Sequence, residues 1–481
     1  MTTGRKGLFS WQTLRLLALL FLALRFVTMT VTNPFMDEAY YWMWGQHPAL
    51  SYIDHPPLVA WVNAASAAIF GWSKLALRLP VLLTMLADLW ILFLFARRLG
   101  GAQWREIFWL SALLSAATPA FILLGYMALP DHLLIPALLA ALYCFHGVLL
   151  AHEAGRQARR LLYLGAIALG LALLSKFTAA LFGLGLLLYL VFSPRHRGLL
   201  RDVHVWLAIG LVAFMQTPVI IWNLQHELVG FGYVMGGRSG FARPNARGLL
   251  GYLLGVLLML SPFLIVATTR FLATRGIAGE GIARTIAWTS FGAFLAASLF
   301  TNILIHWNAI MYIAALPFIG AYLRSRLALV GHLTFGLALL LLVNVNYGIF
   351  PVLSQMEGVS DPTSGWSHGW VEVAARVTAA AADHPGAFIA GTSYENASQL
   401  AFALGNPDVT SLAGRHDAYD DFFDAAGHAG HDALVISDEA RHINGVRDRF
   451  ATLTLLETIP IERLGRVVAH RELYLGTGFI P

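Results

Sequence analysis

Residues 34–57 read PFMDEAYYWMWGQHPALSYIDHPP and place three carboxylates and an imidazole among aromatic side chains. The ionisable residues of this segment are Asp37, Glu38, Asp54 and His55. They follow directly after the first long apolar stretch of the chain, which begins near Leu14. Ionisable groups at the boundary of a bilayer are costly and usually functional. The segment therefore indicates a membrane protein with a site that handles protons or binds a polar group.

The composition outside this segment also indicates a membrane protein. The chain has 481 residues, of which 58% are hydrophobic and 12% are charged. A soluble domain carries roughly 25% charged residues. The formal charge of +5 comes with arginines that cluster in short loops between apolar stretches. Such clusters are better explained by membrane topology than by nucleic acid, so we expect membrane lipids and no nucleic acid as partners.

Eleven apolar stretches are predicted to cross the bilayer as helices. They are 14–32, 77–96, 106–124, 132–151, 161–175, 177–192, 203–223, 249–269, 284–304, 308–323 and 327–349. Residues 161–192 as one helix would be about 48 Å long, whereas the hydrocarbon core measures about 30 Å. The stretch is therefore divided at Ser175-Lys176.

Positive charge supports this division and orients the chain. The division places eight arginines on the inner side and three on the outer side of the membrane, and a single span would exchange the two groups. The inner group is Arg195, Arg197, Arg201, Arg270, Arg275, Arg284, Arg324 and Arg326, and the outer group is Arg238, Arg243 and Arg247. The N-terminus is then inside. Asp37, Glu38, Asp54, His55, Asp131, Lys176, Glu227 and His306 share the outer face.

The composition becomes that of a soluble protein from about Pro351. Residues 387–392 and 432–437 are typical of strands and 394–404 of a helix, and alternating stretches follow at 453–461 and 466–474. The predicted fold is thus an all-α polytopic membrane domain (1–350) followed by a small α/β domain outside the cytoplasm (351–481). The only cysteine, Cys144, lies in an apolar run and excludes an internal disulfide.

Asp37 and Glu38 are the strongest candidates for catalysis. A carboxylate in a partly desolvated pocket can take a proton from an attacking hydroxyl. The alternative is that the acids stabilise the start of a helix, where one would suffice. Asp131 is expected both to begin the fourth span and to contact substrate.

Several other residues are candidates for substrate binding. Asp54 and His55 are held by Pro56-Pro57 and could bind a sugar hydroxyl, bind a metal or close a turn. No further His or Cys lies at metal-ligand spacing, so no metal cofactor is predicted. His306-Trp307 either contacts substrate or anchors the interface. Tyr40, Tyr41 and Tyr52 could stack against a sugar or an isoprenoid.

A buried ammonium at Lys176 needs an anionic partner, which a lipid-linked phosphate would provide. The alternative is that Lys176 reaches out to lipid phosphates at the membrane surface. Arg78 could bind phosphate or pair with the Asp37-Glu38 region. Arg238 and Arg243 lie in the glycine-containing segment 225–247, a candidate lid, and could contact phosphate or acceptor.

Together these motifs resemble the GT-C superfamily of integral-membrane glycosyltransferases, in the branch related to protein O-mannosyltransferases. Bacterial aminoarabinose and rhizobial galacturonosyl transferases that modify lipid A and lipopolysaccharide core are similar in pattern. The matching stretches are MDEAYYW at 36–42, YIDHPPL at 52–58, LRLP at 77–80, LPD at 129–131, LLSKFT at 173–178, WNLQH at 222–226, HW at 306–307 and YENAS at 394–398. Phe177 stands where such enzymes have a tyrosine.

The resemblance implies a sugar donor linked to polyprenyl phosphate and transfer, with inversion, outside the bacterial inner membrane. It implies that Asp37 is the catalytic acid of the first loop, Asp131 that of the second, and Lys176 the phosphate-binding lysine. The expected acceptor is lipid A or lipopolysaccharide core, and a protein hydroxyl is the alternative. A transporter or flippase for a lipid-linked substrate is the alternative from another class. The internal repeats and broken helices typical of transporters are not evident in the sequence.

Overall fold

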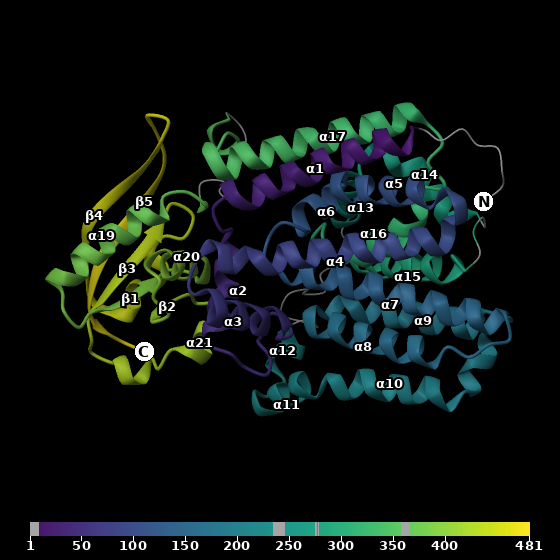
Figure 1. The fold of residues 1–481 in the computed structure, drawn as a ribbon. Coiled ribbons are helices and arrows are strands. Elements are labelled where there is room, and N and C mark those ends of the chain that lie inside the picture. The colour runs from purple at the N-terminus through teal and green to yellow at the C-terminus, as the bar shows by residue number, and fades with distance from the viewer. Residues whose placement is uncertain (1–8, 234–245, 275–276, 278, 357–365) are drawn as a thin grey trace.

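The computed structural model describes residues 9–233, 246–274, 277, 279–356 and 366–481. Its helices run side by side as a bundle, and a small sheet-containing domain covers one end of that bundle (Figure 1). The N-terminus lies at the opposite end. Arg238 and Arg243 fall outside the described residues.

A helix or a bent helix pair occupies each stretch that was predicted to span the membrane. The helices are α1 (Trp11–Val31), α4 (Lys74–Gly100), α5 (Trp104–Ala117), α6 (Pro119–Leu124), α7 (Pro130–Glu153), α8 (Arg159–Ser175), α9 (Ala180–Phe192), α10 (Val203–Met215), α11 (Thr217–Gln225), α13 (Ala246–Leu260), α14 (Ile265–Ala273), α15 (Gly281–Ser298), α16 (Ala309–Ile319) and α17 (Arg326–Asn344). By length and apolar composition, four helices of the described chain could cross a bilayer, or six if each bent pair counts once. Eleven crossings therefore stay a prediction.

The chain reverses direction between α8 and α9, as the arginine distribution predicted. Lys176 leaves the helix in an extended conformation, with φ −154° and ψ 130°. Just beyond the end of α9, Arg195 pairs with Glu153 at the end of α7, with 3.2 Å between the charged atoms. Since α8 begins shortly after Glu153, α8 and α9 run in opposite directions. Lys176 is thus at the end of the bundle that faces the C-terminal domain.

Two short helices, α2 (Met36–Gln46) and α3 (Leu58–Phe70), lie between the bundle and the C-terminal domain (Figure 1). Aromatic side chains pack α2 on both sides. The ring of Trp44 stacks on that of Tyr52 at 4.2 Å, and Trp42 packs edge-on against Phe402 of the C-terminal domain at 5.8 Å. Burial of such rings removes much apolar surface from water, so the first loop is a packed part of the fold.

The C-terminal domain is a five-stranded sheet with helices. Its strands are β1 (Phe388–Gly391), β2 (Val409–Ser411), β3 (Ala433–Asp438), β4 (Phe450–Arg463) and β5 (Arg466–Phe479), in the order β2-β1-β3-β5-β4. β1 pairs in parallel with β2 and β3, and the β4–β5 hairpin adds to β3 antiparallel. The helices are α19 (Trp370–Asp383), α20 (Tyr394–Leu404) and the short α21 (Tyr419–Phe422). The predicted strands and helix agree with these elements.

The C-terminal domain is bound to the bundle through α2 and α3. The indole N–H of Trp72 donates to the carbonyl of Phe402 at 3.0 Å, and the amide of Gln399 donates to the carbonyl of Pro34 at 2.9 Å. Side chains from α2, α3, α20 and the sheet share one hydrophobic cluster. The two parts therefore pack as one body around the junction.

Candidate active site

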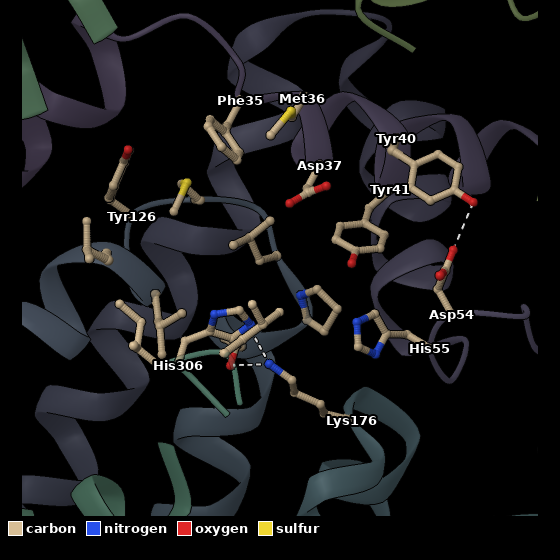
Figure 2. A pocket seen from close by; sticks show the side chains of 18 of the residues that line it. Phe35, Met36, Asp37, Tyr40, Tyr41, Asp54, His55, Tyr126, Lys176 and His306 are labelled. Atoms are coloured by element: carbon tan, nitrogen blue, oxygen red, sulfur yellow. Dashed lines mark hydrogen bonds and ion pairs between the residues drawn. The ribbon is translucent and has the colours of Figure 1, made fainter. Parts of the chain in front are cut away.

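A cavity of about 400 Å³ lies at this junction. It is formed by α2, the loop before α3, the start of α7, the turn at Lys176, the segment before α16 and the C-terminal domain. Eight of the residues proposed from the sequence line it. They are Asp37, Tyr40, Tyr41, Asp54, His55, Asp131, Lys176 and His306. In Figure 2 the side chains of Asp37, Tyr41, His55, Lys176 and His306 point toward a common space.

Lys176 and Asp131 form a buried ion pair in this cavity. The ammonium nitrogen lies 2.8 Å from each carboxylate oxygen, and the bonds appear as dashed lines beside Lys176 in Figure 2. Asp131 is in the first turn of α7, which begins with Pro130, and the Ser175 hydroxyl donates to the Pro130 carbonyl at 2.5 Å. An ammonium has three protons. Two of them are donated to the Asp131 carboxylate, which holds the ammonium at this position.

Asp37 and Glu38 are neighbours in sequence but lie on different sides of α2. Asp37 is half-buried and lines the cavity. Glu38 is fully buried and lies 2.6 Å from the guanidinium of Arg78, on α4. The Glu38 carboxylate also accepts the backbone N–H groups of Phe35 at 2.8 Å and Ala128 at 2.7 Å. Glu38 thus joins α2, α4 and the segment before α7.

Four further residues proposed for the site do not line the described cavity, and for Arg78 the structure shows the predicted alternative of pairing with the Asp37-Glu38 region. Glu38 and Arg78 do not line the described cavity, because their charges are used in holding the loop together. Tyr52 donates its hydroxyl to the carbonyls of Trp44 and His47, which turns it into the core of the first loop. Trp307 packs against Phe294 in the bundle at 6.2 Å rather than facing the cavity. These four residues support the site without entering it.

Asp54 is held by two partners. The Tyr40 hydroxyl donates to one carboxylate oxygen at 3.0 Å (Figure 2), and Arg415 contacts the other at 2.5 Å. Arg415 comes from the C-terminal domain and also lines the cavity, as does Tyr394. Neither was proposed as a site residue. Tyr394 was noted only as part of the matching stretch YENAS, and no motif in the loop after β2 distinguishes Arg415 from any surface arginine.

Burial and neighbouring charges shift the pKa of Arg415 and of Tyr394, the two cavity residues of the C-terminal domain named above. Burial lowers the pKa of Arg415, but Asp54 and nearby tyrosines more than offset this and raise it. Burial, with Asp37 next, raises the pKa of Tyr394. Both groups therefore keep their protons at neutral pH, and Arg415 remains a cation.

One wall of the cavity is apolar. It includes Met259, Leu304 and Ile305. Leu304 is 45% exposed and Ile305 is 38% exposed, and both line the cavity. The cavity thus has exposed apolar side chains on one side.

Among the residues that the structure describes, no group of three or more His, Cys, Asp or Glu side chains is placed to hold a metal ion. That the protein needs no metal cofactor stays a prediction, which an activity assay with a chelator can test.

Comparisons with known proteins agree with this architecture. Residues 54–222 match the family of dolichyl-phosphate-mannose-protein mannosyltransferases. A lipid A galacturonosyltransferase, RgtD, of Rhizobium johnstonii is 30% identical over 201 residues, which cover 41% of this chain and 40% of that protein. The aligned region thus spans about two fifths of that relative.

Two solved structures are similar over almost the whole chain. ArnT from Cupriavidus metallidurans in the apo state has a TM-score of 0.63 and 16% identity, covering 96% of this chain and 97% of that one. The same protein bound to undecaprenyl phosphate has a TM-score of 0.64 and 16% identity, with coverage of 97% and 98%. The chain has the ArnT fold and a mannosyltransferase-family match in its membrane part, which confirms its resemblance to the GT-C glycosyltransferases.

Proposed function

We propose that this protein is an integral-membrane glycosyltransferase that moves a sugar from a polyprenyl-phosphate donor to a hydroxyl of lipid A or lipopolysaccharide core. The site would face the outer side of the bacterial inner membrane. The observation that carries the proposal is the cavity that unites Asp37 with the Asp131–Lys176 pair. The names of the relatives support the substrate class, since one acts on lipid A and one binds undecaprenyl phosphate.

Lys176 binds the donor phosphate in this proposal. Its third ammonium proton is directed to a phosphate oxygen, while Asp131 keeps the ammonium in place and charged. The isoprenoid chain leaves the cavity past Leu304 and Ile305, which are exposed apolar side chains of the cavity wall. The sugar then lies toward α2, where Asp54 and His55 bind its hydroxyls and Tyr41 contacts its ring.

Asp37 is the general base. It takes the proton of the acceptor hydroxyl as the hydroxyl oxygen bonds to the anomeric carbon and the bond from that carbon to the phosphate oxygen breaks. The electron pair of the broken bond goes to the phosphate, and the Lys176 cation stabilises it. Attack from the face opposite the phosphate inverts the anomeric configuration. No step needs a metal ion.

The test is a transfer assay with purified protein in nanodiscs. Radiolabelled sugars on undecaprenyl phosphate, including galacturonic acid and aminoarabinose, are supplied with lipid A, core oligosaccharide or a peptide rich in hydroxyl side chains. We expect label on lipid A or core, unchanged by EDTA. Label on the peptide alone would identify a protein glycosyltransferase. Movement of the donor across proteoliposomes with no transfer to any acceptor would identify a flippase instead.

A further inference from the structure

The loop Leu412–Ala418, between β2 and α21, brings a charged side chain of the C-terminal domain into the cavity. The guanidinium of Arg415 lies 2.5 Å from the Asp54 carboxylate. The side chain of Asp54 is 7% exposed and that of Arg415 is 44% exposed. A buried carboxylate needs a partner for its charge. For Asp54, this partner comes from a position 361 residues away in the sequence.

The same loop fixes the second oxygen of Asp54 through Tyr40. The backbone N–H of Ala418 donates to the Tyr40 hydroxyl at 2.9 Å, and that hydroxyl donates to Asp54 at 3.0 Å. The Tyr40 ring also packs against Tyr394 at 4.5 Å and Tyr419 at 6.0 Å. Each carboxylate oxygen of Asp54 is therefore oriented by a group that the C-terminal domain supplies or holds.

Arg415 also touches a second part of the membrane domain. Its guanidinium lies 5.3 Å from the ring centre of Tyr233, just beyond α12 (Val229–Gly232), and 5.2 Å from that of Tyr394. A guanidinium cation is attracted to the face of an aromatic ring, so positions above Tyr233 and Tyr394 are favourable for Arg415. Arg415 thus connects the first loop, Tyr233 and the C-terminal domain at one edge of the cavity.

We infer that the C-terminal domain is an integral part of the active site and that Arg415 is a positioning residue, which acts by orienting Asp54 toward the donor sugar. This inference rests on the proposed function. A domain that merely covered the cavity would need no cation paired with a cavity carboxylate. The planar guanidinium holds the carboxylate in one orientation, which a flexible ammonium does less well.

The test measures kcat and KM for donor and acceptor with the full-length chain in nanodiscs. The variants are Arg415→Gln, Arg415→Lys, Asp54→Asn and the double variant Asp54→Asn/Arg415→Gln. We expect Arg415→Gln to lower kcat/KM for the donor roughly tenfold or more, since the buried Asp54 carboxylate would lose the cation that orients it. The KM for the acceptor should stay within about twofold. Arg415→Lys should recover part of the loss, because it restores the charge. The double variant should be no worse than Asp54→Asn, because Arg415 acts through Asp54.

Trp72→Phe is the matched control, because it removes an interdomain hydrogen bond of a residue that does not line the cavity. Its donor kcat/KM should stay within about twofold of wild type. Equal losses in Trp72→Phe and Arg415→Gln would show a merely structural contact and overturn the inference. So would multiplicative losses in the double variant, or an Arg415→Gln enzyme equal to wild type. A wild-type chain that transfers no sugar would overturn the proposed function and this inference with it.

Discussion

Two adjacent carboxylates have separate tasks in this protein because of the geometry of a helix. Successive residues on an α-helix point about 100° apart. Asp37 therefore faces the cavity while Glu38 faces Arg78 and the N–H groups of Phe35 and Ala128. The structure thus divides the pair into one group that lines the cavity and one group that stabilises the loop.

Asp37→Asn should lower kcat for sugar transfer by about 10²- to 10⁴-fold, the usual contribution of a general base. The expected cause is chemical, so the melting temperature and the elution volume of the variant should match those of wild type. Radiolabel transfer from the prenyl-phosphate donor measures the effect. Wild-type turnover in this variant would remove Asp37 from the role of base.

Glu38→Gln should lower the stability of the protein rather than its kcat, the opposite of Asp37→Asn. Loss of the charge leaves Arg78 buried without its anion, which costs roughly 3–5 kcal/mol when a buried pair is broken. We expect a clearly lower melting temperature, whereas the fraction that remains folded should keep its kcat. A Glu38→Gln protein that is as stable as wild type but has lost turnover would show that Glu38 takes part in catalysis.

The Lys176–Asp131 pair makes single substitutions at either residue difficult to interpret. Lys176→Ala leaves Asp131 as a buried unpaired charge and should destabilise the fold as well as weaken donor binding. Lys176→Met combined with Asp131→Asn removes both charges and should restore much of the stability. This double variant should still have lost affinity for undecaprenyl phosphate, which a ligand-induced thermal shift can measure. An unchanged shift would exclude Lys176 as the phosphate-binding residue.

At the scale of elements, the loop after β2 contributes to the cavity in a way that no local sequence pattern predicted. The loop carries Arg415 to Asp54 and places Asp417 in a buried position. The Asp417 carboxylate accepts the Tyr419 N–H at 2.9 Å and the Ser411 hydroxyl at 3.2 Å. Burial, with Asp420 and Asp54 as further causes, nevertheless raises the pKa of Asp417 to about 7.

This raised pKa predicts how the stability of the C-terminal domain depends on pH. The folded state holds the Asp417 proton more tightly than the unfolded state, whose value is near 3.8. The stabilising contribution is therefore complete below pH 3.8, falls as pH rises, and is lost above about pH 7. Thermal unfolding of wild type at pH 5 and pH 8 should show this fall, and Asp417→Asn should show a smaller one. Equal pH dependence of the two proteins would assign the effect to other groups.

At the scale of the whole molecule, the helical bundle and the C-terminal domain meet at one end, and the cavity lies between them (Figure 1). The opposite end carries Arg195 and its partner Glu153. The charge distribution predicts that this opposite end faces the cytoplasm. A cavity at the outer end would give a lipid-linked donor and a lipid acceptor access from the same leaflet.

Cysteine labelling can test this orientation, because Cys144 is the only native cysteine and is buried. In a Cys144→Ser background, Asp383→Cys places a thiol on the exposed end of α19, and Arg195→Cys places one beyond α9. We expect a membrane-impermeant maleimide to label Asp383→Cys in spheroplasts at once. Arg195→Cys should react only after lysis. The reverse pattern would contradict an active site outside the cytoplasm.

Much of the architecture could be read from local patterns. Hydropathy located the helical stretches, since each is a continuous apolar run, and the excess of arginine on one side predicted the reversal at Lys176. Period-two alternation located the two stretches that form β4 and β5, but not their pairing as a hairpin. The candidate site residues were also recognisable where a carboxylate, imidazole or ammonium stood in an apolar context. These properties depend on a residue and its near neighbours, so a linear chain displays them.

Other properties depend on how the helices are rotated and packed. Three contacts of this kind join residues 40 or more positions apart in the sequence. They are the pairs Glu38–Arg78, Asp131–Lys176 and Asp54–Arg415. No hydropathy or charge pattern encodes such contacts, because they form only when the bundle and the C-terminal domain pack together. The amino-acid order therefore determined the kind of protein and its chemical groups, and packing in three dimensions determined which of these groups meet in the cavity.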